Sequence, residues 1–279
     1  MPVSAASQPA ASRPAASRPA TSRPVVSQPA ASQSATFQPA SVQSAPWDLR
    51  ILTWNLWELR GDVAALIEAI QDLQPDVLLI QEAPRFVLPT ARLRWFARQI
   101  DRRILVGGAG GRGLAILATD DVAAQVIRRG AHPVAQTVSD LNSTYPRGVA
   151  AVRLSVPGGG AVVLSSTHLA LQEDNRMRHA QHLAALVRSA GAPVIVGGDL
   201  NETATGSARS FLAPLLSDPA EQTEHTFPAD SPTRRIDAIL TTTGVTVQEA
   251  RAVRATVRVS EERLSGASDH LPTLLSISL

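Results

Sequence analysis

The stretch LRILTWNLWELRGDVAALIEAIQDLQPDVLLIQE occupies residues 49–82 and carries two apolar runs around an amphipathic segment. The first run, LRILTWN, ends at Asn55 and has the length and composition of a buried strand. GDVAALIEAIQDL has apolar side chains at helical spacing, and Pro75 ends the predicted helix. DVLLIQE is then a second buried strand. This pattern predicts a strand–helix–strand unit, in which a helix covers a β-sheet.

Further strands are predicted along the rest of the chain, together with two more helices. The helices are TARLRWFARQI (90–100) and DNRMRHAQHLAALVRSA (174–190). The predicted strands are ILVGG (104–108), GLAILAT (113–119), GVAAVRLSV (148–156), AVVLSSTHL (161–169), PVIVGGDLN (193–201), RIDAILTTT (235–243), RATVRVS (254–260) and LPTLLSISL (271–279). Many strands with a few evenly spread helices predict an α/β sandwich, with the helices outside packed sheets.

The first 46 residues form a different region. From Ser7 the sequence repeats every five residues, and proline holds the third position in six of the eight units. Such a segment cannot bury apolar surface or continue a helix, so we expect residues 1–46 to be disordered or polyproline-like. A linker or an over-extended gene start is favoured over a ligand-binding role. Residues 47–279 are then the predicted folded domain.

Composition excludes several classes of function. The chain has no cysteine, which removes disulfides, thiolate zinc sites and cysteine nucleophiles. All 26 basic residues are arginine, and three of them precede Trp47, so residues 47–279 hold 23 basic and 24 acidic residues. This nearly neutral domain is not a strongly basic nucleic-acid binder. With no visible signal peptide or apolar run long enough to span a membrane, we expect a cytoplasmic protein. We also expect it to be a monomer.

Side chains able to do chemistry follow the predicted strands in a repeated way. They stand at or next to strand ends, where open α/β sheets bind ligands, at Asn55, Glu82, His168, Asp199, Asn201, Asp237, Asp269 and His270. Glu82 and Asp269 supply the hard oxygen donors that Mg²⁺ or Mn²⁺ prefers. Histidines can donate to developing charge on a phosphate or accept a proton from water. The set predicts metal-assisted hydrolysis of a phosphate ester.

Six motifs carry a resemblance to a known family. In chain order they are TWNL, IQE, STHL, GGDLN, RIDAIL and SDHLP, from about Arg50 to Leu279. Each motif alone is weak, but six in this order over one domain resemble the endonuclease/exonuclease/phosphatase superfamily, whose members include DNase I-like nucleases. The resemblance implies a four-layer α/β sandwich, in which two packed mixed β-sheets are flanked by helices.

The resemblance also implies roles for individual residues. Asn55, Glu82 and Asp269 would surround the catalytic metal, which we expect to be Mg²⁺ with Mn²⁺ as the alternative. His168 and Asn201 would contact the scissile phosphate, and Asp199 would position or activate the water. Asp237 and His270 would form a carboxylate–histidine pair, and the choice of general base between Asp199 and His270 stays open. The family places a polar residue on a middle strand near the phosphate, for which Tyr145 and Arg147 are the candidates.

The sequence indicates the substrate molecule less clearly than it indicates the phosphate ester bond that is hydrolysed. A Mg²⁺-dependent nuclease is the first hypothesis. A phosphatase or phosphodiesterase acting on a small or lipid-derived phosphate is the second, and an inactive binding module of the same fold is the third. Arg92, Arg94, Arg98, Arg102 and Arg103 form one arginine cluster, for which a solvated helix face is the alternative. No membrane-binding helix or hydrophobic hairpin stands out, which weakens the lipid hypothesis.

Overall fold

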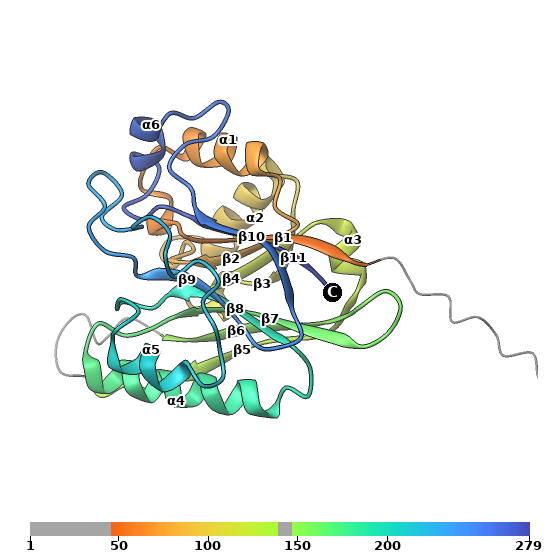
Figure 1. The fold of residues 1–279 in the computed structure, drawn as a ribbon. Helices are drawn as coiled ribbons and strands as arrows, with labels where there is room; N and C mark the ends of the chain where they lie inside the picture. The colour runs from red at the N-terminus through yellow and green to blue at the C-terminus, as the bar shows by residue number, and fades with distance from the viewer. Residues whose placement is uncertain (1–45, 139–146) are drawn as a thin grey trace, which may run out of the picture. The chain divides into compact units, whose positions relative to one another are not determined.

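Two β-sheets form the centre of the domain (Figure 1). The computed structural model describes residues 46–138 and 147–279. One sheet has six strands in the order β10-β11-β1-β2-β4-β3: β1 (Asp48–Asn55), β2 (Val77–Gln81), β3 (Arg103–Val106), β4 (Ala115–Ala118), β10 (Thr246–Ala252) and β11 (Thr273–Ser278). The other has five strands in the order β5-β6-β7-β8-β9: β5 (Val126–Val134), β6 (Arg147–Ser155), β7 (Ala161–His168), β8 (Val194–Asp199) and β9 (Asp237–Thr241).

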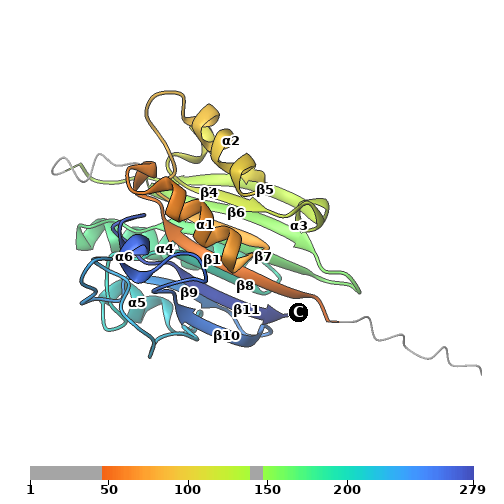
Figure 2. The ribbon, with the colours of Figure 1, turned by 90° about the horizontal axis from the view of Figure 1, so that it is seen from above.

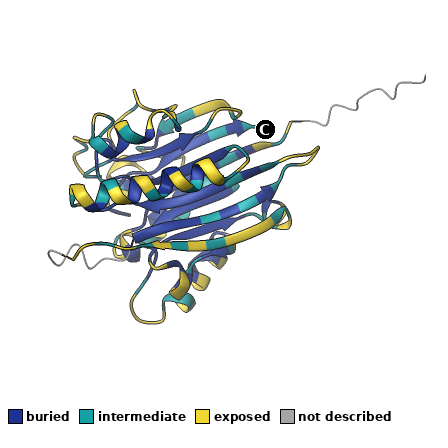
Figure 3. Cartoon of the chain, turned by 90° about the horizontal axis from the view of Figure 1, so that it is seen from below, coloured by how far each residue is buried: buried dark blue, intermediate teal, exposed yellow. Residues whose placement is uncertain are grey.

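Helices cover the outer faces of both sheets (Figure 2). The six-stranded sheet packs against α1 (Val63–Leu73), α2 (Pro89–Gln99) and α6 (Glu261–Ser265). The five-stranded sheet packs against α4 (Glu173–Ser189) and α5 (Ser207–Leu212), and α4 keeps its outer side exposed (Figure 3). Short elements complete the chain: η1 (Trp57–Leu59), η2 (Gly108–Gly111) and α3 (Asp120–Ala124). The predicted four-layer α/β sandwich is confirmed.

Each of the three interfaces between these layers has its own apolar cluster. On β1, Leu52 and Trp54 face the helices, whereas Leu49 and Ile51 face the other sheet. Both faces of the strand are therefore covered, and this explains why its sequence is nearly continuously apolar rather than alternating. The helix after it, α1, is capped by Asp62, whose carboxylate accepts the Ala65 amide hydrogen at 2.9 Å.

One predicted strand is wrong. RATVRVS (254–260) is a loop, and the strand of that region is β10 at Thr246–Ala252. The loop is held by Asp72, which accepts hydrogen bonds from the Thr256 hydroxyl and from Arg258. These bonds lower the pKa of Asp72 to about 2 despite its partial desolvation. Alternating valines resembled a strand here, yet Val257 is 94% exposed. β5, an exposed edge strand that contains glycine and proline, was not predicted at all.

The close approach of the two sheets leads to a stability prediction. A Cβ atom on Gly197 would lie 2.7 Å from Leu79 Cδ1 and 2.9 Å from Thr53 Cβ, which belong to the opposite sheet. We expect Gly197→Ala to lower the free energy of unfolding by about 1–3 kcal/mol through overpacking. Chemical denaturation measures this change. Gly110→Ala is the matched control, since its Cβ would meet no atom within 4 Å; an equal loss in both variants would contradict the prediction.

No helix in the described parts of the chain, 46–138 and 147–279, is long and apolar enough to cross a membrane.

Candidate active site

The topology brings six strand ends to one edge of the sandwich. β1 and β2 are parallel, with Asn55 opposite Gln81, and β7 and β8 are parallel, with His168 opposite Asp199. β9 is antiparallel to β8, so its first residue, Asp237, lies opposite Asp199. β11 is antiparallel to β1, which places the segment before it beside the end of β1. Residues from six distant motifs therefore meet because of strand direction.

Asp199 is the centre of the hydrogen-bond network at this edge. Its Oδ2 lies 3.0 Å from His168 Nε2 and accepts the side-chain amide of Asn55 at 3.1 Å. Its Oδ1 accepts the backbone N–H of Asn201 at 3.0 Å. Since Asn55 belongs to the six-stranded sheet and Asp199 to the five-stranded one, the carboxylate joins the two sheets.

Asp237 and His270 form a buried pair next to Asp199. His270 Nδ1 lies 2.9 and 3.1 Å from the two carboxylate oxygens of Asp237, and its Nε2 lies 3.7 Å from Asp199 Oδ2. The Phe227 ring packs against the imidazole at a centroid distance of 4.6 Å. The His270 carbonyl accepts the Trp54 indole N–H at 2.8 Å. Asp237 and Phe227 therefore hold the imidazole, which lies between the carboxylates of Asp237 and Asp199.

The pKa values of the two histidines of this site are shifted in opposite directions. Burial works against a charge on His270, but the carboxylates of Asp237 and Asp199 outweigh it and raise its pKa to about 10. Burial and the Arg147 guanidinium lower the pKa of His168 to about 4. Burial alone would raise the pKa of Asp199, but the two histidines hold it below its usual range. At neutral pH these shifts favour a protonated His270 and a neutral His168.

Glu82 and Asp269 provide the hard oxygen donors of the edge. Glu82 follows β2 in a left-handed backbone conformation, with φ 47°, and is half-buried like Asp269. Burial and the neighbouring carboxylates of Asp199 and Asp269 raise its pKa. A divalent cation would relieve this crowding of like charges. Asn55 Oδ1 accepts the Trp57 amide hydrogen at 3.0 Å, which leaves one lone pair for a cation. The donor set fits Mg²⁺ or Mn²⁺.

A second group of potential ligands lies beside this one. Asp199, Asp237 and His270 each bring a ligand atom to within 4.8 Å of the other two. A protonated imidazole carries a hydrogen on each nitrogen, so His270 in that form offers no lone pair to a metal. We therefore keep Asn55, Glu82 and Asp269 as the candidate metal ligands.

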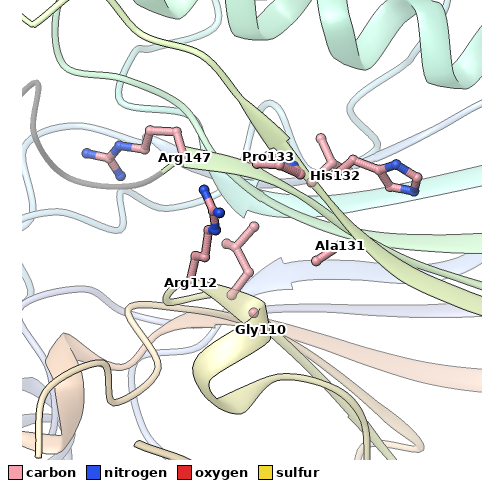
Figure 4. A pocket seen from close by; sticks show the side chains of 10 residues that line it. Gly110, Arg112, Ala131, His132, Pro133 and Arg147 are labelled. Atoms are coloured by element: carbon pink, nitrogen blue, oxygen red, sulfur yellow. The ribbon is translucent and has the colours of Figure 1, made fainter.

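The remaining predicted residues that the structure describes, Asn201 and Arg147, lie around the same edge. Asn201 is in a left-handed conformation, with φ 54°, and one of its amide hydrogens bonds the Leu169 carbonyl. Arg147 begins β6, is buried, and acts electrostatically on both Glu82 and His168. Figure 4 shows Arg147 and Arg112 at one small pocket, with His132 directed away from them. Tyr145 lies outside the described residues.

Sequence reasoning missed a layer of polar residues beneath the site. Gln81 Nε2 donates to Ser166 Oγ at 2.9 Å, and this bond crosses from one sheet to the other. The Ser268 hydroxyl donates to the Asn55 carbonyl at 2.6 Å. Both Gln81 and Ser166 are fully buried. A glutamine and a serine within apolar strands were the available signal, since buried polar groups require partners.

Comparison with known proteins identifies the family to which the chain belongs. The model of the Endonuclease/Exonuclease/phosphatase family matches residues 52–270, and the chain belongs to that family. The predicted resemblance is confirmed. Members of the family hydrolyse phosphoester bonds and generally depend on a divalent metal, so the chain is a metal-dependent phosphoester hydrolase. A comparison with curated proteins finds no match.

Solved structures share the fold at low sequence identity. An endonuclease/exonuclease/phosphatase from Bacteroides vulgatus is 18% identical, with a TM-score of 0.66 over 84% of this chain and 99% of its own. A mannosyl-6-phosphatase from Bacteroides thetaiotaomicron is also 18% identical, with a TM-score of 0.63 over 82% and 99% of the two chains. ANGEL2, a 2',3'-cyclic phosphatase, is 15% identical, with a TM-score of 0.62 over 84% and 96%. These likenesses concern the fold.

Proposed function

We propose that the protein is a divalent-metal-dependent phosphodiesterase whose active site is the edge around Asp199. The observation that carries the proposal is the series His168–Asp199–His270–Asp237, which lies beside the carboxylates of Glu82 and Asp269. His168 lies 3.0 Å from Asp199 and His270 lies 2.9 Å from Asp237, while Asp199 and His270 approach to 3.7 Å. Its members come from β7, β8, β9 and the segment before β11, so the fold itself holds them in place. Mg²⁺ is the proposed metal, with Mn²⁺ as the alternative.

A cation held by Asn55, Glu82 and Asp269 would supply charge neutralisation at a phosphate oxygen and lower the pKa of a bound water. Asp199, kept ionised by the histidines around it, would accept a hydrogen bond from the attacking water and orient it. His270, protonated between Asp237 and Asp199, would donate to the charge that develops on the phosphate. Arg147 and the second amide hydrogen of Asn201 would bind the other phosphate oxygens.

Nucleic acid is the substrate that we propose first. One arginine of α2, Arg92, donates to the Glu58 carbonyl at 2.9 Å, and the Glu58 amide donates to the Glu82 carbonyl at 2.8 Å, so a cation lies near the proposed site. A lipid-derived phosphodiester is the second candidate, and a specific observation favours it: Phe86, Val87 and Leu88, just after Glu82, are 61%, 80% and 71% exposed. The sequence had weakened the lipid hypothesis because no exposed apolar hairpin was recognised. FVLP directly after QEAPR was the overlooked signal.

Hydrolysis of defined substrates separates these candidates. We expect Mg²⁺-dependent turnover of at least one phosphodiester among plasmid DNA, duplex DNA with an abasic site, and sphingomyelin. Inositol phosphates serve as phosphomonoester substrates in the same buffer. Cleavage of sphingomyelin without cleavage of DNA would refute the nuclease assignment. Turnover confined to inositol phosphates would refute the phosphodiesterase proposal.

A further inference from the structure

An unusually exposed apolar segment lies next to the proposed active site. Phe86, Val87 and Leu88 are more than half exposed, and Trp95 on α2 is 48% exposed. Two arginines flank Trp95 on the outer face of the helix, Arg94 and Arg98. We call these six residues the α2 surface. Figure 2 shows α2 and the loop before it at the outer edge of the domain.

The loop of the α2 surface is held in place although its apolar side chains are exposed. Arg85 Nε donates to Glu58 Oε1 at 3.0 Å, and an Arg92 guanidinium nitrogen donates to the Glu58 carbonyl at 2.9 Å. Val87 and Leu88 have φ angles of 41° and 55°, which are strained for residues with a Cβ atom. The Arg85 guanidinium lies over the Phe86 ring at 5.0 Å, and Val87 and Leu88 remain 80% and 71% exposed. An apolar patch of this kind marks an interaction site.

The charge of the segment selects the kind of partner. Residues 83–100 contain four arginines and no aspartate or glutamate. The side chains of Arg94 and Arg98 form no ion pair with any residue in 46–138 or 147–279, so their charges are available to a partner. Apolar side chains beside unpaired cations match a surface that offers both hydrocarbon and negative charge.

We propose that the α2 surface docks on an anionic lipid bilayer. Phe86, Val87 and Leu88 would enter the boundary between headgroups and acyl chains, while Arg94 and Arg98 would contact anionic headgroups. Phe86 is four residues after Glu82, so the bilayer would be held within about 14 Å of a proposed metal ligand. The proposal concerns binding and does not require that the edge around Asp199 hydrolyse lipid.

Two other partners fit the same residues less well. Affinity for nucleic acid grows with the number of phosphates neutralised, and the α2 surface offers two unpaired arginines. Three adjacent apolar side chains offer no hydrogen bond to phosphate or base. In a two-fold dimer this surface would meet its own copy, which would bring four arginines together without a carboxylate.

Vesicle binding tests the proposal with the full chain in EDTA, where hydrolysis cannot contribute. We expect cosedimentation with mixed phosphatidylcholine and phosphatidylglycerol vesicles and weak binding to pure phosphatidylcholine. The triple variant Phe86→Ser, Val87→Ser, Leu88→Ser should bind at least about tenfold more weakly. Arg94→Gln with Arg98→Gln should lose roughly 30-fold in affinity for the anionic vesicles. All changes are at exposed positions, and circular dichroism checks that each variant is folded.

The matched control changes an apolar residue and two arginines that are equally exposed but lie on β5. This variant, Ile127→Ser with Arg128→Gln and Arg129→Gln, should bind anionic vesicles like wild type. Absence of vesicle binding, or equal losses in the control and the α2 variants, would overturn the proposal. So would a wild-type preference for duplex DNA or for self-association that the triple variant abolishes. Because catalysis is not measured, failure here leaves the phosphodiesterase proposal standing.

Discussion

Replacing His270 with alanine is expected to lower kcat by about 10³-fold or more, with a much smaller effect on KM. The imidazole bridges Asp237 and Asp199, and these carboxylates raise its pKa to about 10. Alanine would remove the cation that is placed to stabilise charge on the phosphate, and it would leave two buried carboxylates side by side. Asp237→Asn should cause a comparable loss, since the amide cannot stabilise the imidazolium.

Steady-state kinetics on the phosphodiester that wild type turns over best measures these effects. His225→Ala is the matched control, because His225 is exposed and lies outside the network of Asp199. Thermal denaturation of each variant shows whether the fold survives. If folded His270→Ala keeps more than a tenth of wild-type kcat, the proposed role of this histidine is wrong.

The second large effect concerns the metal. Chelation with EDTA should abolish turnover, and addition of Mg²⁺ or Mn²⁺ should restore it. Glu82→Gln should lower kcat by about 10²-fold or more and weaken activation by Mg²⁺, because it removes a hard, charged oxygen donor. The measurement is turnover as a function of free metal concentration.

Stability gives an independent readout of the same substitution. In metal-free protein, burial and the carboxylates of Asp199 and Asp269 make the charge of Glu82 unfavourable. Glu82→Gln should therefore leave the thermal midpoint unchanged or raise it in EDTA, while the stabilisation of wild type by Mg²⁺ should be lost. Glu249→Gln on the edge strand β10 is the control and should retain both responses. Full metal activation of Glu82→Gln would contradict the assignment of this ligand.

Much of the fold could be predicted from the sequence because the patterns that specify its helices and strands lie within single segments of the chain. The helix at Val63–Leu73 combines a capping aspartate, apolar spacing and a following proline, and all three act within one segment. β5 was missed because an edge strand buries little surface and so needs no apolar pattern. The valines of 254–260 suggested a strand, but side-chain bonds from Asp72 hold a loop there. Such tertiary contacts leave no periodic trace in sequence.

The sequence predicted which residues gather at this edge, but it did not predict which of them contact one another. Strand-end placement singled out Asp199 and His270, yet sequence could not show that Asp199 contacts both histidines and Asn55. That contact depends on how the two sheets pack. The exposed loop at Phe86 was overlooked for the opposite reason, because apolar residues are normally expected inside a protein.

The most direct test of the proposed active site is hydrolysis of bis(4-nitrophenyl) phosphate, an activated phosphodiester whose product is coloured. Wild type, Glu82→Gln, His270→Ala and the two control variants would be compared with Mg²⁺ and with EDTA. We expect turnover that requires the metal, is retained by His225→Ala and Glu249→Gln, and is lost in Glu82→Gln and His270→Ala. Turnover in EDTA, or equal rates for wild type and His270→Ala, would contradict a metal-dependent phosphodiesterase centred on Asp199.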